Sequence, residues 1–495
     1  MRSNDHLTRR AILRGAAVAI SAQSLPGISK AAGFPMIEAN DSSALLPHAR
    51  PKLADRKFVS QAVEDTIRET QRRIADPNLA ILFENCFPNT LDTTVSAGSL
   101  AGKPDTYVVT GDIDAMWLRD SSAQVWPYLS LLKQDSKLRE LVEGVIRNQG
   151  RMIRLDPYAN AFTRNPTDPP LSWAVDDKTT HIPGVGERKW EIDSLCYPIR
   201  LAHGYWRATG DTQPFDGDWK QTAWTILRTF RDQQRKQGPG PYSFQRSSPI
   251  PSDTVPLSGF GNPAKPVGLI FSIFRPSDDA CILPLFIPAN LFAIHSLRQL
   301  AEIAKDVFQD DALRSGCLEL AEEVEQSVAR YGVLDSPEHG RMWAYEVDGY
   351  GNALKMDDAN APGLLGLAYL GCCRLDDPIY RASRAFTLSD ANPYFFRGKV
   401  AEGVGGPHIG LHYVWPMSIM FRAFTSTDNA EIRQCLLWLR DTTAGTGFMH
   451  ESFHCDNAKD FTRAWFAWAN TLFGELILKL AKERPAVLSE PFTAR

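Results

Sequence analysis

Apolar runs with helical spacing recur along the chain, and a short polar segment opens each of them. Gly111–Ser121 holds three acids, an arginine and a tryptophan, and it leads into the run Gln124–Leu132. The later polar segments are Glu191–Ser194, Arg275–Asp279, Met356–Asn360, Gly406–His408 and His450–Phe453. The runs that follow them are Leu195–Trp206, Ala280–Leu297, Pro362–Leu370, Tyr413–Phe424 and Trp465–Leu480. Apolar residues three and four positions apart predict helices with one buried face.

More strongly charged amphipathic segments alternate with these runs. They are Arg56–Ile74, Ser136–Met152, Trp219–Gln237, Asp310–Tyr331, Pro378–Ala385 and Glu431–Thr442. Successive polar segments are unevenly spaced, which excludes a solenoid with a fixed repeat. The alternation predicts an all-α fold, an (α/α)6 toroid of six helical hairpins with the apolar helices inside. A minor β contribution is expected from the turn-rich stretch Ile81–Val109.

If the inner helices run parallel, the six polar segments meet at one end of the ring. Helix N-termini carry partial positive charge there, which favours carboxylates. The alternative is that the polar segments are only helix caps. Caps rich in aspartate explain one or two segments, but they explain poorly why Arg119, His408, His450 and Arg463 recur at the same positions.

Composition and motifs exclude several functional classes. The chain of 495 residues is 43% hydrophobic and 23% charged, with a net charge of −4, so it lacks the basic field of a nucleic-acid-binding protein. The eight cysteines are scattered and show neither metal spacing nor a disulfide framework. We find no glycine-rich phosphate loop, no G-x-S-x-G elbow and no H-E-x-x-H zinc helix. No convincing linker divides residues 45–490, which we interpret as one domain.

Residues 1–32 resemble a twin-arginine (Tat) signal peptide. Arg9 and Arg10 precede a short apolar run, Gly15–Ala22, and small residues follow up to Ala32. The apolar run is well below the roughly 20 residues that a membrane span requires. This pattern predicts export of the folded chain to the periplasm and no membrane span.

The polar segments concentrate acids of the kind that glycoside hydrolysis requires. That reaction uses one carboxyl group as an acid and another as a base or nucleophile. The candidates are Asp112, Asp114, Asp120, Asp193, Asp278, Asp279, Asp357, Asp358 and Glu451. Like charge raises the pKa of one acid in an adjacent pair, as a general acid needs, although adjacent acids are also common on surfaces. Glu451 lies in a glycine-containing stretch where it can face a trapped water, or it is a capping residue ahead of the last helix.

Several of these motifs resemble glycoside hydrolase family 125. They are Gly111–Ser121, Phe274–Ala280, Met356–Asn360, Gly445–Glu451 and Phe461–Asn470. The resemblance extends from about Asp55 to Leu480. It implies an (α/α)6 toroid that acts as an exo-α-1,6-mannosidase, inverts the anomeric configuration and needs no metal or other cofactor.

Carried onto this sequence, the resemblance implies that Asp278 is the general acid, with its neighbour Asp279 as the alternative, and that Glu451 is the general base. From their positions in the polar segments we predict a set of substrate-binding residues: Trp117, Arg119, Asp120, Asp193, Asp279, His408, His450 and Arg463. The expected substrate is an α-mannoside oligosaccharide, such as a mannan or N-glycan fragment. The Gly- and Pro-rich stretch 238–268 is expected to be a long loop that closes one side of the pocket.

Two alternative functions remain at this point. A non-catalytic periplasmic glycan-binding protein on the same toroid would keep the aromatic and arginine residues without needing both Asp278 and Glu451. A polysaccharide lyase would need a cationic patch for uronate carboxylates, and the acid-rich polar segments argue against it. Fold alone does not decide between them.

Overall fold

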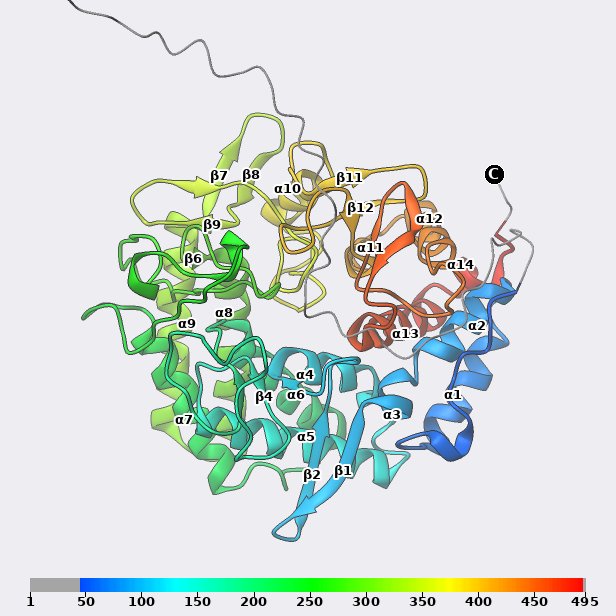
Figure 1. The fold of residues 1–495 in the computed structure, drawn as a ribbon, viewed down its shortest axis with the longest axis horizontal. Helices are drawn as coiled ribbons and strands as arrows, with labels where there is room; N and C mark the ends of the chain where they lie inside the picture. The colour runs from blue at the N-terminus through cyan, green and yellow to red at the C-terminus, as the bar shows by residue number, and fades with distance from the viewer. Residues whose placement is uncertain (1–44, 493–495) are drawn as a thin grey trace, which may run out of the picture. The chain divides into compact units, whose positions relative to one another are not determined.

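The computed structural model describes residues 45–492 (Figure 1). The predicted signal peptide, residues 1–32, lies outside the described residues. Within the described part, no helix is both long and apolar enough to cross a membrane. The structure confirms a mostly helical fold whose strands are short.

The inner ring is built from the predicted apolar runs. Its helices are α4 (Leu118–Val125), α6 (Asp193–Thr209), α8 (Ile287–Asp306), α11 (Pro416–Phe424) and α13 (Ala467–Glu483). Neighbours pack as α8 on α6, α6 on α4, α4 on α13 and α13 on α11. Residues 361–371 fill the gap between α8 and α11. Gly371 packs against His295 of α8, and the Tyr369 ring contacts Phe421 and Phe424 of α11 in tilted arrangements. The ring is thereby closed.

The charged amphipathic segments form the outer helices. They are α1 (Gln61–Gln71), α5 (Ser136–Leu155), α7 (Gly217–Asp232), α9 (Asp311–Tyr331), α10 (Pro378–Thr387) and α12 (Asn429–Asp441). Helix α2 (Pro77–Cys86), which the sequence pattern did not predict, packs against α1 and α13. In Figure 1, α9 lies outside α8 and α5 lies outside α6. Aspartates cap several of these helices, as Asp135 does for α5 and Asp310 for α9. Two short helices, α3 (Asn89–Thr93) and α14 (Pro485–Ser489), complete the helical set of the described residues.

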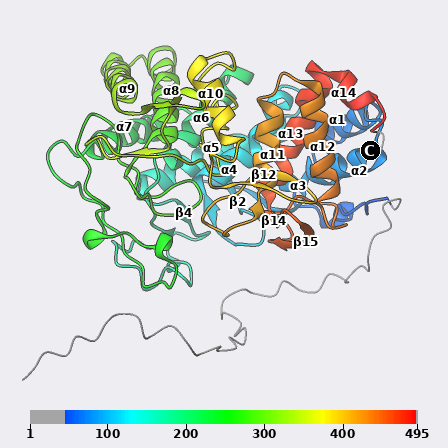
Figure 2. The ribbon, with the colours of Figure 1, turned by 90° about the horizontal axis from the view of Figure 1, so that it is seen from above.

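Short antiparallel strands gather on one side of the helices, as β2, β4, β14 and β15 show in Figure 2. The hairpins are β1 (Val95–Leu100) with β2 (Lys103–Val108), β7 (Val333–Ser336) with β8 (Gly340–Trp343), and β11 (Phe395–Arg397) with β12 (Glu402–Val404). The three-stranded sheets are β3 (Met116–Trp117), β4 (Ala161–Phe162) and β5 (Val185–Glu187); β10 (Ala353–Leu354), β9 (Glu346–Val347) and β6 (Leu285–Phe286); and β13 (Tyr413–Val414), β14 (Ser452–His454) and β15 (Asn457–Thr462). Strands β3, β6 and β13 lead directly into α4, α8 and α11, so the sheets hold the N-terminal ends of these inner helices.

Several predicted boundaries differ from the structure, and three of the differences concern α8, α4 and residues 81–109. Helix α8 begins at Ile287 rather than at Ala280, because the backbone N–H groups of Ile282 and Leu283 donate to the Glu346 carboxylate instead of starting a helix. Helix α4 gives way to a 3-10 helix from Trp126, where Pro127 has no N–H to continue the α-helical pattern. Residues 81–109 are less strand-rich than predicted, since α2 and α3 precede the hairpin β1–β2.

The predicted helix Pro362–Leu370 is absent, and this inner position is a series of turns. The carboxylate of Asp357 accepts the backbone N–H groups of Leu364 and Leu365 at 2.7 and 2.9 Å, and it competes with helical hydrogen bonding there. Glycines at 363, 366 and 371 add to the effect, since glycine disfavours a helix by roughly 1 kcal/mol relative to alanine.

A polar and aromatic layer fills the middle of the ring. The Arg200 guanidinium lies 3.4 Å from the centroid of the Trp126 ring and 5.2 Å from that of Tyr369. Glu475 accepts hydrogen bonds from Trp126 Nε1 and Tyr369 Oη at 3.1 and 2.8 Å. These side chains lie about eight residues beyond the N-terminal ends of α4, α6 and α13, or roughly 11 Å at about 1.5 Å per residue. The layer therefore closes the ring beneath those ends.

Candidate active site

A cavity of about 320 Å³ lies at the N-terminal ends of the inner helices. This volume is at the lower end of the range of about 300–1,000 Å³ that is typical of small-molecule sites. Seven of the ten residues predicted from the sequence line it: Trp117, Arg119, Asp120, Asp278, His408, Glu451 and Arg463. The inner helices therefore run parallel as predicted, and residues far apart in the chain converge on one site.

Arg119 is the central cation of the site. It lies in the first turn of α4 with 3% of its side chain exposed. Its Nη1 lies 2.6 Å from Glu191 Oε2 and 3.1 Å from Asp193 Oδ2, while its Nη2 lies 3.4 Å from Asp278 Oδ1. Its Nε lies 3.6 Å from Asp120 Oδ2. One buried guanidinium thus faces four carboxyl groups.

Asp278 occupies a tight turn that directs its carboxyl group into the cavity. Its backbone has a φ of 66°, in the left-handed region that aspartate tolerates better than most residues, and its N–H donates to the carbonyl of Arg275. Lys189 Nζ donates to the Asp278 carbonyl at 2.8 Å. Asn160 Nδ2 donates to Asp278 Oδ1 at 3.1 Å. Backbone and side chain are therefore both fixed by neighbours outside the turn.

The pKa values of Asp278 and Glu191 are shifted in opposite directions. Burial opposes ionisation of Asp278, but the charges of Arg119 and Lys189 outweigh it and lower the pKa of Asp278 to about 2. Burial raises the pKa of Glu191 well above its ordinary value, and the charge of Asp278 adds to this rise. Ionisation is therefore favoured at Asp278 and disfavoured at Glu191.

The prediction of a raised pKa within each adjacent acid pair is confirmed for Asp357 and Asp358 and is wrong for Asp278 and Asp279. Burial raises the pKa of Asp357 to about 8, and burial also raises the pKa of Asp358. Burial opposes the ionisation of Asp279 too, but its contact with His408 outweighs this effect and lowers the pKa. Asp278 and Asp279 face different cations, so their mutual repulsion does not decide their charge.

Glu451 lines the same cavity from the segment that leads into β14. Its Oε1 lies 3.3 Å from Arg463 Nη1, and its Oε2 accepts a hydrogen bond from Thr462 Oγ1 at 3.0 Å. Arg463 also binds Asp112 of the first polar segment. The carboxylate of Glu451 is thus oriented by the strand β15 and the residue that follows it.

His408 lies near the acids of two segments, Asp278 and Asp279 in one and Glu451 in the other. Its Nδ1 is 3.6 Å from Asp279 Oδ1. Burial opposes protonation of the ring, but the carboxylates of Asp279, Glu451 and Asp278 outweigh it and raise the pKa of His408 to about 9. The imidazole is therefore cationic at neutral pH.

Asp193, Asp279 and His450 do not line the cavity. Asp193 lies behind Arg119, and Asp279 lies behind His408. The ring of His450 is buried, stacks on Phe461 and places its nitrogens 3.2 and 3.1 Å from backbone carbonyls. Burial lowers the pKa of His450 to about 4. Sugar binding by these three residues stays a prediction.

The residues of one wall of the cavity were not among those predicted from the sequence. Arg246 Nη2 lies 2.8 Å from Glu187 Oε1, and Arg246 Nη1 lies 3.1 Å from Asp253 Oδ1. Lys189 Nζ lies 2.7 Å from the same Asp253 oxygen, and Trp173 Nε1 donates to Glu187 Oε1 at 3.2 Å. Arg246 and Asp253 belong to the loop 238–268, which therefore borders the cavity as expected. Trp173 lies in a loop without periodicity, and no pattern in the sequence marks it.

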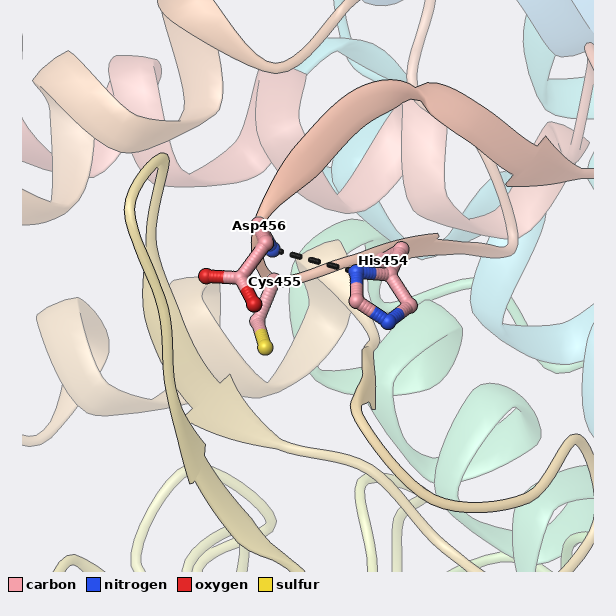
Figure 3. A group of neighbouring side chains, drawn as sticks. All are labelled: His454, Cys455 and Asp456. Atoms are coloured by element: carbon pink, nitrogen blue, oxygen red, sulfur yellow. Dashed lines mark hydrogen bonds between the residues drawn. The ribbon is translucent and has the colours of Figure 1, made fainter.

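One group of neighbouring side chains in the described residues has the composition of a metal site: His454, Cys455 and Asp456 at the end of β14 (Figure 3). None of the three lines the cavity. His454 Nδ1 accepts the backbone N–H of Asp456 at 3.2 Å, and Asp456 Oδ1 accepts the backbone N–H of Lys399 at 2.8 Å. These backbone hydrogen bonds give the cluster a role in holding the turn, and we assign no metal to it.

A helical toroid whose cavity holds separated carboxyl groups between aromatic walls is typical of a glycoside hydrolase. The chain belongs to glycoside hydrolase family 125, the metal-independent α-mannosidases, whose family model matches residues 76–478. It is an α-mannosidase by this membership.

Three known proteins are similar to this chain. The solved structure of a metal-independent α-mannosidase from Streptococcus pneumoniae, in a non-productive complex with α-1,6-mannobiose, is 37% identical and matches with a TM-score of 0.82 over 86% of this chain and 100% of that chain. The "Meiotically up-regulated gene 157 protein" of Schizosaccharomyces pombe is 42% identical over 90% of both chains. A GH78 family rhamnosidase of Bacillus sp. GL1 is 11% identical, with a TM-score of 0.50 over 83% of this chain and 35% of that chain, which concerns the fold alone.

Proposed function

We propose that this α-mannosidase removes terminal non-reducing α-1,6-linked mannose by an inverting single displacement. Asp278 donates a proton to the glycosidic oxygen as the bond to C1 breaks. Glu451 takes a proton from the water that attacks the opposite face of the sugar. The observation that carries this proposal is the placement of Asp278 and Glu451 on separate segments around one cavity.

Inversion requires space for a water between the base and the sugar. Inverting glycosidases separate their two carboxyl groups by about 6.5–9.5 Å, whereas retaining enzymes hold them about 5 Å apart. Asp278 and Glu451 each have their own arginine, Arg119 and Arg463, and their own hydrogen-bond donors. Independent anchoring of this kind suits two groups that act from opposite faces of one sugar.

The lining of the cavity fits a polyhydroxylated ligand. Trp117, Trp173 and Trp415 line it together with charged side chains such as Arg119 and Arg463. Small-molecule sites combine aromatic walls with a few placed polar groups in this way. Sugar hydroxyl groups can bond to the charged groups, and the apolar face of a pyranose can pack on an aromatic ring.

The exo mode of action is supported by the shape of the site. The layer around Arg200 closes the ring beneath the cavity, and the loop 238–268 borders its side with Arg246 and Asp253. A pocket closed below and at one side accepts the end of a glycan rather than its middle. The relative from Streptococcus pneumoniae binds α-1,6-mannobiose, which supports the same linkage here.

The deciding experiment is NMR of the products formed from α-1,6-mannobiose. We expect β-mannose as the first-formed anomer, followed by slow mutarotation. Parallel incubations with α-1,2- and α-1,3-mannobiose measure how selective the enzyme is for the α-1,6 linkage. Release of α-mannose first would contradict inversion, and binding without cleavage would support the glycan-binding alternative.

We also propose export through the twin-arginine pathway, which rests on the sequence of residues 1–32 alone. A fusion of this segment to a reporter that is active only after folded export is the direct test. Replacement of both Arg9 and Arg10 by lysine is expected to abolish export.

A further inference from the structure

The buried acids around Arg119 outnumber the cations that face them. Four carboxyl groups surround this one guanidinium, and they belong to Asp120, Glu191, Asp193 and Asp278. Lys189 adds a second positive charge near Asp278, and it is shared with Glu187 and Asp253. Burial of an unpaired carboxylate is strongly unfavourable, so such a cluster retains at least one proton.

Glu191 is the acid best placed to hold that proton. It is fully buried, and its Oε2 is bound by Arg119 Nη1 at 2.6 Å and by Ser194 Oγ at 2.8 Å. Its other oxygen, Oε1, is buried and receives no hydrogen bond from any donor in the described protein. The carboxyl groups of Glu191 and Asp278 are hydrogen-bonded to each other. Two carboxyl groups form such a bond only when one of them is protonated.

The other groups around Glu191 do not compete for this role. Asp193 also has a buried oxygen without a partner, and burial raises its pKa to about 6, but it forms no hydrogen bond with Asp278 in the structure. Tyr242 and Cys281 lie within electrostatic reach of Glu191, and burial raises the pKa of both, so they stay neutral. The hydrogen bond to Asp278 is therefore the distinguishing feature of Glu191.

We propose that Glu191 is a positioning residue that stores the proton which Asp278 delivers to the leaving group. This inference rests on the proposed function, in which Asp278 is the general acid. The proton moves from the carboxyl group of Glu191 to Asp278 along their hydrogen bond, and Glu191 becomes a carboxylate paired with Arg119. Asp278 then passes the proton to the glycosidic oxygen as the C1–O bond breaks. Water forms the new C1–O bond and gives a proton to Glu451, which releases it to solvent, and the Asp278–Glu191 pair takes up one proton from solvent.

The substitution Glu191→Gln tests this role. Glutamine has the same size and can donate an N–H to Asp278, but it has no proton to transfer. We expect kcat/KM for α-1,6-mannobiose at neutral pH to fall by ~100-fold or more, the usual contribution of a general acid. For α-mannosyl fluoride, whose leaving group needs little protonation, we expect a fall of less than ~10-fold. The alkaline limb of the pH profile should move to lower pH, because the pair loses its proton more easily.

Asp193→Asn is the matched control, since it also removes one carboxylate from Arg119. It should change kcat/KM for both substrates by a similar factor and leave the alkaline limb in place. Glu191→Asp, which restores a proton-bearing group, should recover part of the alkaline limb. Equal losses on both substrates with an unmoved pH profile in Glu191→Gln would show that Glu191 is only structural.

A measurement on the unsubstituted protein avoids dependence on the folding of a variant. Carboxyl-¹³C-labelled glutamate in the wild-type protein should show by NMR one carboxyl group that remains protonated at neutral pH. Absence of such a signal would overturn the proposal. Wild-type protein that cleaves neither substrate while it retains this signal would overturn the proposed function, and the delivery step inferred from it, but not the assignment of the stored proton.

Discussion

Arg463 Nη1 lies 3.3 Å from Glu451 Oε1, and the guanidinium that makes this contact also joins this part of the chain to the first polar segment. The same guanidinium binds Asp112, whose segment opens α4 more than 300 positions earlier. Arg463 has a φ of 38° and only 20% of its side chain is exposed. A strained, half-buried arginine between two acids is arranged to orient the proposed base rather than to be a free surface charge.

Arg463→Gln is expected to reduce turnover more than binding. The glutamine side chain is shorter and cannot contact Glu451 and Asp112 together, so the base loses one of its two anchors. We expect kcat to fall by ~10–100-fold with a smaller change in KM, since a misplacement of about 1 Å can lower a rate by roughly 100-fold. Steady-state kinetics on α-1,6-mannobiose measures this, and Arg374→Gln is the control, because the Arg374 side chain is 83% exposed, pairs with Asp376 and does not line the cavity. A change confined to KM would contradict the orienting role.

Glu451→Ala tests the base and the stereochemistry together. Loss of the base should reduce kcat by about 10²–10⁴-fold, because water is no longer activated. Azide needs no deprotonation, so it should restore turnover and form β-mannosyl azide by attack on the face opposite the leaving group. The product is identified by NMR. Formation of α-mannosyl azide would contradict single displacement, and full activity without azide would remove Glu451 from the mechanism.

Trp173→Ala is expected to weaken binding of the leaving sugar. Trp173 lines the cavity with 45% of its surface exposed, and its Nε1–Glu187 bond links it through Asn160 to Asp278, on the leaving-group side. An aromatic contact contributes about 0.5–1.5 kcal/mol, which corresponds to a rise in KM for α-1,6-mannobiose of ~3–10-fold. The KM for α-mannosyl fluoride, which has no leaving sugar, should not change. An equal rise in KM for both substrates would show that Trp173 does not contact the leaving sugar.

Much of the ring could be predicted because each inner helix carries its own sequence signal. The 3.6-residue periodicity of α6 and α9 and their polar starts are local features, and the structure reproduces them within a few residues. The segment 361–371 shows the limit of this approach. Its apolar residues resemble a helix, but whether Asp357 takes the N–H groups of Leu364 and Leu365 depends on burial, which periodicity does not show.

The same limit applies to the site. His408 and His450 occupy equivalent positions in the sequence pattern, yet one lines the cavity among carboxylates and the other turns toward backbone carbonyls. Glu191 lies inside a predicted polar segment, but its importance depends on the hydrogen bond to Asp278, 87 positions away in the chain. Adjacency in the sequence pointed to Asp279 as the electrostatic partner of Asp278, whereas the fold supplies Glu191.

His408 should make the stability of the protein depend on pH above neutrality. Its pKa in the folded protein is about 9, above the ordinary value of 6.5, so protonated His408 stabilises the fold fully below about pH 6.5 and this stabilisation is lost as the pH rises through 9. The side chain is 36% exposed, so solvent screening limits the effect to about 1 kcal/mol. Urea unfolding at pH 6 and pH 9.5 should show this difference in the wild type and not in His408→Gln. A variant with the same pH dependence as the wild type would assign the effect to another group.

Glu346→Gln should destabilise the whole fold, because it breaks a buried ion pair that sets the start of α8. Arg275 Nε lies 2.7 Å from Glu346 Oε1, and both side chains are at most 2% exposed. The other oxygen of Glu346 accepts the N–H groups of Ile282 and Leu283. Loss of one partner leaves a buried guanidinium unpaired, which costs about 3–5 kcal/mol in the free energy of unfolding.

Chemical denaturation measures this change, and the double variant Arg275→Met with Glu346→Gln is the informative comparison. If the unpaired charge causes the loss, the double variant should be more stable than Glu346→Gln alone, because no buried cation remains. If the loss of stability instead comes from the weakened hydrogen bonds of the Ile282 and Leu283 N–H groups, the single and the double variant should lose the same free energy of unfolding. The first outcome is expected, because an uncompensated buried charge is costlier than a weakened hydrogen bond to a neutral amide oxygen.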